Sequence, residues 1–184
     1  MGSLAEEEKQ VRWYVMRDLK RPNAKLPAYK QLADERMEVF TPLRWCLRVK
    51  AGKRVREQVP VIQDLLFVRS SQEALEPILR KTPTLQFRYQ KGGGYCRPMT
   101  VADADMERFI YAVSASDCPK YYLPEELTPA MCNRPIHIVG GSLNGYVGRL
   151  LTVRGSKTKR LLVELPGFLS VGVEIENPEY IQLL

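Results

Sequence analysis

Residues 139–155 read VGGSLNGYVGRLLTVRG, and this stretch decides the fold of the C-terminal part of the chain. It holds five glycines in seventeen positions, with apolar residues between them. Glycine loses more conformational freedom on folding than any other residue, so this density needs a structural reason. A loop around a ligand and a tight strand–turn–strand are the two explanations. Gly145 and Gly148 flank Tyr146 and Val147, where a turn leads into a strand and a Cβ atom would clash, which favours the tight turn.

Short strand-like runs follow one another around this turn, with glycine and proline between them. Five short strands within about fifty residues are typical of a small closed barrel. The runs are RPIHIV (134–139), GYVGRLLTV (145–153), KRLLVEL (159–165), LSVGVEI (169–175) and YIQLL (180–184).

The segment before the barrel has the composition of a linker. Residues 114–133 show no periodicity, contain three prolines and carry more acidic than basic side chains. We therefore predict an N-terminal domain over 1–113, a linker over 114–133 and a barrel over 134–184.

The first 113 residues alternate strand and helix patterns. Ser70 and Glu73 have the spacing of a capping box, which predicts a helix start there. Met106, Phe109, Ile110 and Val113 recur at helical spacing and predict one buried face. The expected strands span 11–17, 37–50, 55–62, 64–70 and 84–90, and the expected helices span 26–36, 70–81 and 100–113.

The segment MEVFTPLRWCLRVK (37–50) alternates apolar and polar residues with a period of two. This pattern predicts a half-buried strand, with an edge or bulge at Pro42 because proline interrupts the hydrogen-bond ladder. Trp45 shares its parity with Met37 and Val49, so we expect it to be more buried than Phe40 and Pro42. The residues AGKR (51–54) form the predicted turn into the next strand.

The net charge of the 184-residue chain is +7, and the surplus lies in the first domain. Residues 1–113 carry 21 Lys and Arg against 14 Asp and Glu. Neutralising phosphates releases condensed counterions, so this surplus points to a polyanionic partner.

Several function classes are excluded by what the sequence holds. No apolar run approaches the roughly 20 residues of a membrane-spanning helix, and MGSLAEEEKQ lacks the apolar core of a secretory signal. The four cysteines are far apart without a CxxC motif, and His137 is the single histidine. We therefore expect a soluble cytoplasmic protein that is not an enzyme and binds no metal or cofactor.

Two groups of residues resemble a known family. GGSLNGYVGRLLTVRG followed by KRLLVELPG resembles the KOW motif, the glycine-centred turn of an SH3-like barrel. RWYVMR, EVFTPLR, the basic GKR hairpin and VPVIQDLLFVR resemble the NGN domain of NusG-family transcription factors. The resemblance covers about 12–184 and implies an α+β fold, with an NGN α/β sandwich built on an antiparallel sheet, a linker and a KOW barrel.

Within this family the chain is more similar to operon-specific paralogues of the RfaH and UpxY type. The segments MTVADADMERFIYAV and GRLLTVRGSKTKRLLVELPG carry that similarity, although Ile62-Gln63-Asp64-Leu65 replaces a common Phe-Pro-Gly-Tyr run. The resemblance implies transcription elongation and antitermination for a capsular polysaccharide operon. The alternatives are a general housekeeping NusG-like factor and a ribosome- or RNA-associated KOW protein.

The family resemblance implies an apolar surface that binds the clamp helices of the largest RNA polymerase subunit. An amphipathic helix pair docks into an apolar groove, where aromatic side chains dominate the contact. The alternative is that each of these residues belongs to the ordinary core. The candidates are Phe40, Pro42, Trp45, Leu65 and Phe67, with Tyr14 on the adjacent strand.

A basic set is the second candidate surface, and the resemblance implies that it approaches non-template DNA or nascent RNA. Lys and Arg would position phosphates there. The alternative is a solvated charged sheet edge, which protects against aggregation. Lys20, Arg21 and Lys25 precede the first helix, and Arg48, Lys50, Lys53 and Arg54 lie on the predicted hairpin.

The resemblance also implies a protein partner for the barrel, either a small-subunit ribosomal protein or a termination factor. Some relatives refold this domain into a helical hairpin. Val163, Val171, Val173 and Ile175 favour strands here, so we expect a barrel.

Overall fold

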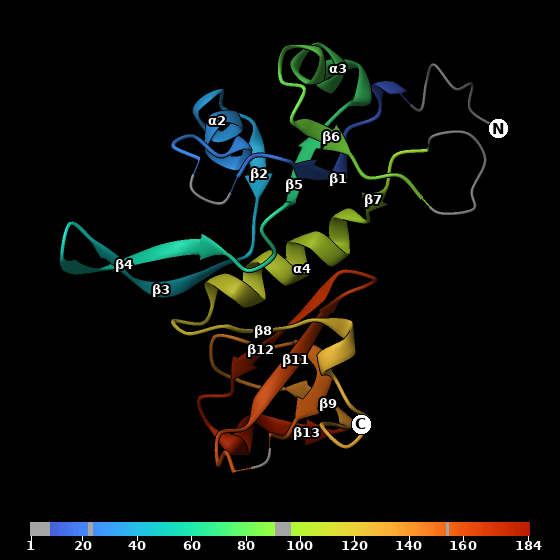
Figure 1. The fold of residues 1–184 in the computed structure, drawn as a ribbon. Coiled ribbons are helices and arrows are strands. Elements are labelled where there is room, and N and C mark those ends of the chain that lie inside the picture. The colour runs from blue at the N-terminus through green and yellow to red at the C-terminus, as the bar shows by residue number, and fades with distance from the viewer. Residues whose placement is uncertain (1–7, 22–23, 91–96, 154) are drawn as a thin grey trace. The chain divides into compact units, whose positions relative to one another are not determined.

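The computed structural model describes residues 8–21, 24–90, 97–153 and 155–184 (Figure 1). The chain forms two compact units, Met1–Asp103 and Ala104–Leu184. Most of helix α4 (Asp103–Ser114) therefore groups with the C-terminal unit. The module boundaries expected at 113 and 133 remain a prediction. Most of the N-terminal segment MGSLAEEEKQ lies outside the described residues.

The first unit is built on an antiparallel sheet with β1 (Arg12–Asp18) at its centre. β5 pairs along one side of β1, while β6 and β7 pair with the two ends of its other side. β2 completes the sheet beyond β5, so the order is β2-β5-β1-β6, and the predicted antiparallel sheet is confirmed. The remaining bounds are β2 Glu38–Phe40, β5 Leu65–Ser70, β6 Leu85–Phe87 and β7 Thr100–Val101.

Helices α2 (Ala28–Asp34) and α3 (Gln72–Lys81) supply the apolar side chains that cover one face of this sheet. Alternate residues of a strand point to the same face, so Tyr14 and Met16 of β1 face the same helices. Each fully buried leucine contributes roughly 1.5–3 kcal/mol of transfer free energy. The buried cluster consists of Tyr14, Met16, Ala28, Leu32, Leu66, Val68, Leu75, Leu85 and Phe87.

Helix α3 begins one residue later than its capping-box pattern predicts. Ser71 is the N-cap, and its hydroxyl accepts a hydrogen bond of 3.3 Å from the backbone N–H of Ala74. Ser70 cannot serve because it is the last residue of β5, paired with Arg12 of β1. The pairing of β5 with β1 therefore overrides the capping-box spacing of Ser70 and Glu73 and leaves Ser71 as the cap.

The predicted strand 37–50 is split in two by Pro42. Its first part is β2, and its second part is β3 (Leu43–Lys50), which pairs with β4 (Lys53–Pro60) in a separate two-stranded sheet. Figure 1 shows this hairpin extending from its unit. Ala51 and Gly52 both have positive φ, 50° and 75°, so the turn has two residues rather than the four predicted at 51–54.

The prediction that β3 is half-buried is wrong. Trp45, Leu47 and Val49 are 50%, 73% and 70% exposed, whereas Pro42 is buried and Phe40 is half-buried. The order of burial expected for Trp45 is therefore reversed. Sequence alternation shows that these side chains share one face, but a two-stranded ribbon has no further layer to cover that face.

The second unit contains α4 and an antiparallel sheet of order β13-β9-β10-β11-β12-β8. All five strands predicted for the barrel are present, which agrees with the α+β expectation. A sixth, β8 (Lys120–Tyr122), pairs with β12 although it lies in the predicted linker. The other strands are β9 Cys132–Ile138, β10 Val147–Leu151, β11 Arg160–Leu165, β12 Leu169–Glu174 and β13 Ile181–Leu183.

The stripe predicted on α4 is largely confirmed by burial. Met106, Phe109 and Ala112 are fully buried, and Ile110 and Val113 are half-buried.

Among the helices that the structure describes, none is both long and apolar enough to cross a membrane.

Candidate functional site

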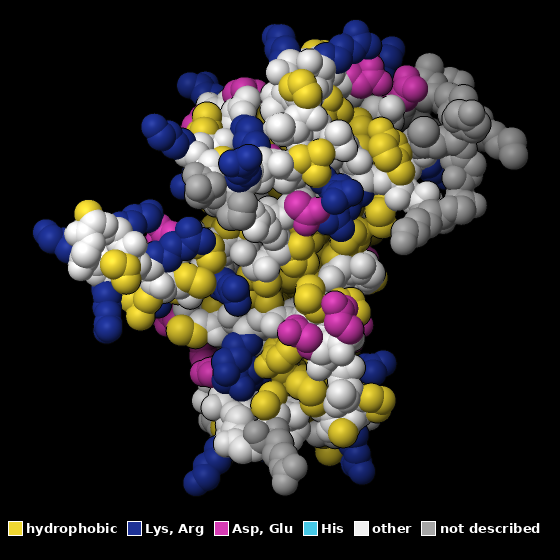
Figure 2. All heavy atoms as spheres, in the orientation of Figure 1, with side chains coloured by type: hydrophobic (Ala, Val, Ile, Leu, Met, Phe, Trp, Pro, Cys, Tyr) yellow, Lys and Arg dark blue, Asp and Glu magenta, His cyan; other side chains and the backbone are white. Residues whose placement is uncertain are grey.

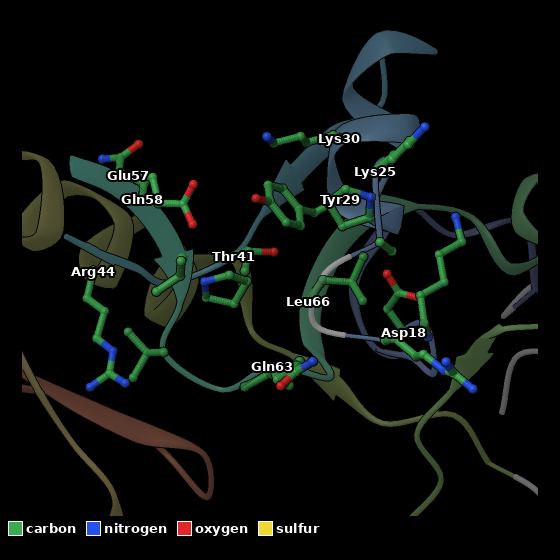
Figure 3. Close-up of a pocket in the computed structure, with 18 of the residues that line it drawn as sticks. Asp18, Lys25, Tyr29, Lys30, Thr41, Arg44, Glu57, Gln58, Gln63 and Leu66 are labelled. Atoms are coloured by element: carbon green, nitrogen blue, oxygen red, sulfur yellow. The ribbon is translucent and has the colours of Figure 1, made fainter. Parts of the chain in front are cut away.

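The first unit contains a cavity of about 560 Å³ beside the β3–β4 hairpin. The connection from β1 to α2, helix α2 itself, both hairpin strands and the start of β5 contribute to its walls (Figure 3). Seven cationic side chains line it, against the two carboxylates of Asp18 and Glu57. The cations are Lys20, Arg21, Lys25, Lys30, Arg44, Arg48 and Lys50.

Asp18 holds the backbone of the cavity wall in place. Its carboxylate accepts hydrogen bonds from the backbone N–H of Lys20 at 3.0 Å and of Ala28 at 2.6 Å. These bonds tie the end of β1 to the first residue of α2, and Asp18 is only 8% exposed. Both carboxylate oxygens are thus engaged by the protein itself.

Glu57 of β4 neutralises part of the positive charge. It forms ion pairs with Arg48, at 3.0 Å, and with Lys50. The hydrogen bond from Lys50 lowers the pKa of Glu57, and the charges of Lys50, Arg48 and Lys30 act in the same direction. Burial raises the pKa of the neighbouring Tyr29 phenol, with a further contribution from the Glu57 carboxylate.

Five cations of the cavity are not neutralised by an ion pair within the part of the chain that the structure describes. They are Lys20, Arg21, Lys25, Lys30 and Arg44. Of these, Lys20 donates to the backbone oxygen of Leu26 at 2.9 Å. The cavity therefore retains unneutralised positive charge, which suits an anionic ligand.

The structure brings together most of the basic set predicted for nucleic-acid contact. Lys20, Arg21, Lys25, Arg48 and Lys50 line one cavity, although they lie up to thirty positions apart in the sequence. Lys53 and Arg54 do not line it, because they lie beside the hairpin turn and are exposed. Tyr29, Lys30 and Thr41 were missed; the helical pattern around 26–36 could have indicated the first two.

The residues predicted for polymerase binding do not lie on one open surface. Tyr14, Leu65 and Phe67 are 3%, 2% and 0% exposed. Tyr14 pairs with Val68 and Val15 pairs with Phe67, so Tyr14 and Phe67 point to opposite faces of the sheet. Phe40 packs on Phe67, with ring centroids 6.3 Å apart, and is the partly accessible member of that pair.

Trp45, another of the six predicted residues, lies on the exposed apolar face of the hairpin. The guanidinium of Arg56 lies 4.6 Å from the centre of its ring, a cation–π contact. Leu47 and Val49 continue this face, opposite Arg56 and Arg54 of β4. Figure 2 shows apolar and basic side chains together on the surface of the hairpin.

In the second unit, the two glycines predicted at the turn have different structural roles. Gly145 has a φ of +85°, which residues with a side chain rarely adopt. A Cβ atom on Gly148 would lie 2.6 Å from the backbone oxygen of Leu162 on the neighbouring strand. A turn and a close strand approach, rather than a ligand loop, thus account for these two residues.

Neither histidine nor cysteine forms a metal centre in the described residues. His137 contacts Gln182 at 3.3 Å, and Cys46, Cys118 and Cys132 are free thiols, while Cys96 lies outside the described part of the chain. No group of three potential metal ligands is found there.

Comparison with protein families gives a match to residues 11–110 of the chain. The matching family model is described as NusG, transcription termination factor nusG. It covers more than half of the chain, including β1, the hairpin and the residues that line the cavity. A comparison with curated proteins gives no match.

Proposed function

The chain belongs to the NusG family of non-enzymatic transcription elongation and termination factors, and we propose that it is a specialised antitermination factor. Membership of this family implies binding to RNA polymerase. In the proposed mechanism the bound protein holds the polymerase clamp closed and shifts the population towards the elongating state. Its place of action would be the cytoplasm.

We assign the polymerase contact to the apolar surface around Phe40 and Trp45. Phe40 is half-buried on top of Phe67, and Trp45 is half exposed on the adjoining hairpin. The buried Pro42, Leu65, Phe67 and Tyr14 would support this surface from beneath or hold the sheet in shape. Accessible aromatic side chains are what an amphipathic helix pair needs for docking.

Charge substitutions at the two accessible residues test this assignment. The variants Phe40→Asp and Trp45→Asp should reduce co-purification of polymerase with the full-length protein. Val11→Asp is the matched control, since Val11 is also an exposed apolar residue of the same unit, at 53%. Phe67 is a poor site for this test because truncating a fully buried phenylalanine costs about 3–5 kcal/mol. If both variants remain folded and retain polymerase like the control, the assignment is wrong.

We assign the nucleic-acid contact to the basic residues of the cavity and hairpin. The single observation that supports it best is the cavity itself, where seven cations face two carboxylates. Non-template DNA and nascent RNA are both single strands. When a protein binds a single strand, the logarithm of the binding constant falls linearly with the logarithm of the salt concentration, with a slope of about 0.7 per phosphate contact. Substituting Lys25 or Lys53 with Gln should reduce the slope by about that amount.

The operon-specific role is proposed from sequence similarity alone, through the segments 99–113 and 148–167. The measurement is read-through of a terminator placed behind a capsular polysaccharide leader, with and without the protein. Read-through at unrelated terminators would indicate a general factor instead. If the full-length protein co-purifies with ribosomal RNA but not with polymerase, the ribosome-associated alternative is indicated. Mass spectrometry of the co-purified material would identify a ribosomal protein or termination factor bound to the barrel.

A further inference from the structure

The outer edge of strand β3 has no partner among the strands that the structure describes, since β3 pairs with β4 along its other edge. Hydrogen-bonded and non-bonded residue pairs alternate along an antiparallel ladder. The N–H of Val61 donates to the carbonyl oxygen of Pro42 at 2.8 Å, just beyond the register of the hairpin, so the even-numbered residues of β3 bond to β4. The backbone N–H and C=O groups of Trp45, Leu47 and Val49 therefore point away from β4, towards the outer edge.

The side chains along this edge form two exposed rows. Alternate residues of a strand lie on the same face, so one row is apolar and the other is basic. The hairpin surface carries both kinds of side chain (Figure 2). The apolar row, on one face, consists of Trp45, Leu47 and Val49. The basic row, on the opposite face, consists of Arg44, Arg48 and Lys50.

The two edges of the hairpin differ in their charge. On β4, Arg54 and Arg56 lie on the face of the apolar row and Lys53 lies on the other, so cations occupy both faces. Charged side chains on an edge strand protect it from pairing with another chain. The β3 edge has cations on one face only, so it can accept a strand that supplies apolar side chains on one face and acidic side chains on the other.

A second copy of the chain does not meet this requirement through the same edge. Antiparallel pairing of two β3 strands, with their outward backbone groups bonded to each other, would place the basic row of one copy beside the basic row of the other. Like charges on neighbouring strands are destabilising. The charge pattern therefore favours an acidic partner over a dimer.

We propose that the outer edge of β3 binds an extended segment of a protein partner in which apolar and acidic residues alternate. The segment joins the hairpin as a third strand, with its backbone bonded to Trp45, Leu47 and Val49. Its apolar side chains cover the apolar row, and its carboxylates pair with the basic row. The proposal goes beyond the polymerase and nucleic-acid contacts and does not rest on them, because strand addition uses the backbone of β3.

The test is calorimetric titration of the full-length protein with a peptide of alternating valine and glutamate that is as long as β3, eight residues. The peptide should bind at a single site. Covering Trp45 should also shift the tryptophan fluorescence to shorter wavelength, since the other tryptophan, Trp13, is already buried. The matching valine–lysine peptide should bind at least about tenfold more weakly, because its charges would face the basic row.

Backbone N-methylation of the peptide distinguishes strand addition from docking by side chains alone. One peptide is methylated on its valine nitrogens and the other on its glutamate nitrogens. Successive N–H groups of a strand point to opposite edges, so only one of the two peptides should lose binding. Loss in the valine-methylated peptide would indicate antiparallel addition, and loss in the glutamate-methylated peptide would indicate parallel addition. Equal binding of the two methylated peptides, whether strong or weak, would overturn the proposal.

Two substitutions in the protein test the two rows. Leu47→Asp should weaken the acidic peptide about tenfold or more without changing the melting temperature, because Leu47 is 73% exposed. Leu19→Asp is the matched control, since Leu19 is an exposed leucine of the same unit and the change in net charge is the same. Arg44→Glu should weaken the acidic peptide and strengthen the valine–lysine peptide.

Several results would overturn the proposal. These are no saturable binding of the acidic peptide, wild-type affinity in Leu47→Asp, and an equal loss in Leu19→Asp. Sedimentation of the full-length protein checks the alternative occupant. A dimer that Leu47→Asp dissociates would show that the edge binds a second copy instead.

Discussion

The ring of Tyr111 on helix α4 stacks on the ring of Tyr146 in the glycine-rich turn, with centroids 5.4 Å apart and planes inclined by 19°. The Tyr111 hydroxyl donates to the backbone oxygen of Ser142 at 2.9 Å, and the Tyr146 hydroxyl lies 3.4 Å from the backbone oxygen of Arg108. Each ring therefore contacts the backbone of the other's segment. This pair is one reason why α4 groups with the C-terminal sheet.

We expect the two tyrosines to be energetically coupled. A double-mutant cycle with Tyr111→Ala and Tyr146→Ala should give a coupling of about 0.5–1.5 kcal/mol, typical of stacked aromatic pairs. Urea unfolding of the full-length variants measures it. Additive effects of the two substitutions would show that the stack contributes no free energy beyond the burial of each ring.

The glycines at the turn should differ in how substitutions act on them. Gly148→Ala should destabilise by about 1–3 kcal/mol, because its Cβ meets the backbone of Leu162, which cannot move aside easily. A Cβ atom on Gly145 would have open space around it. Gly145→Ala should therefore lower the free energy of unfolding by only about 1–2 kcal/mol, because alanine disfavours the left-handed backbone conformation.

Gly145→Asn separates the two causes, since asparagine tolerates the left-handed region. It should recover part of the loss at position 145, whereas Gly148→Asn should recover none. Urea midpoints that follow the opposite order would contradict these assignments.

The hairpin turn contains a residue that is not ideal for its conformation. Ala51 has a φ of 50°, and two-residue hairpin turns with positive φ at both central residues prefer Asn before Gly. Ala51→Asn should stabilise the hairpin by about 0.5–1 kcal/mol, and Ala51→Val should destabilise it. Because the hairpin can open locally, hydrogen exchange of the β3 and β4 amides is the measurement. Equal protection in both variants would contradict the turn geometry.

Tyr121 should make the C-terminal unit sensitive to alkali. Burial raises the pKa of Tyr121 to about 12, and its hydroxyl has no partner among the described residues. The pKa of Tyr121 in the folded protein lies above the unfolded value of about 10. Its contribution to the free energy of unfolding is therefore fully present when the pH is below about 10, and it is lost as the pH rises through about 12.

Tyr121→Phe should remove that part of the alkaline destabilisation without reducing stability at pH 7, since it deletes an unsatisfied hydroxyl. Thermal unfolding between pH 7 and 11 measures this, with Tyr89→Phe as the control at an exposed tyrosine. Identical pH profiles for Tyr121→Phe and the wild type would show that the phenol is not buried.

Much of the fold could be predicted from local patterns. The buried strand at 65–70, the helix at 72–81 and the five C-terminal strands follow from periodicity and turn residues that lie close together in the sequence. The start of α3 could not, since the capping-box spacing favours Ser70, and the pairing of β5 with β1 makes Ser71 the cap instead. Strand β8 was missed because three residues carry too little pattern to distinguish an added strand from a linker.

The candidate site was predictable in composition but not in shape. The basic residues around 20–25 and 48–54 are evident in the sequence, yet five of them share one cavity with Tyr29, Lys30 and Thr41. For the apolar candidates, the sequence did not predict which side chains are exposed. The alternating pattern around Trp45 predicts that it is more buried than Phe40, yet Trp45 is half exposed and Phe40 is half-buried.

The amino-acid sequence alone determined most of the strands and helices and the glycine-rich turn, because each depends on residues within one or two turns of chain. Tertiary structure alone decided which apolar face stays uncovered, which serine caps a helix and that the Thr41 hydroxyl has no hydrogen-bond partner among the described residues. Those outcomes depend on which distant segments approach one another, and local periodicity carries no information about that approach.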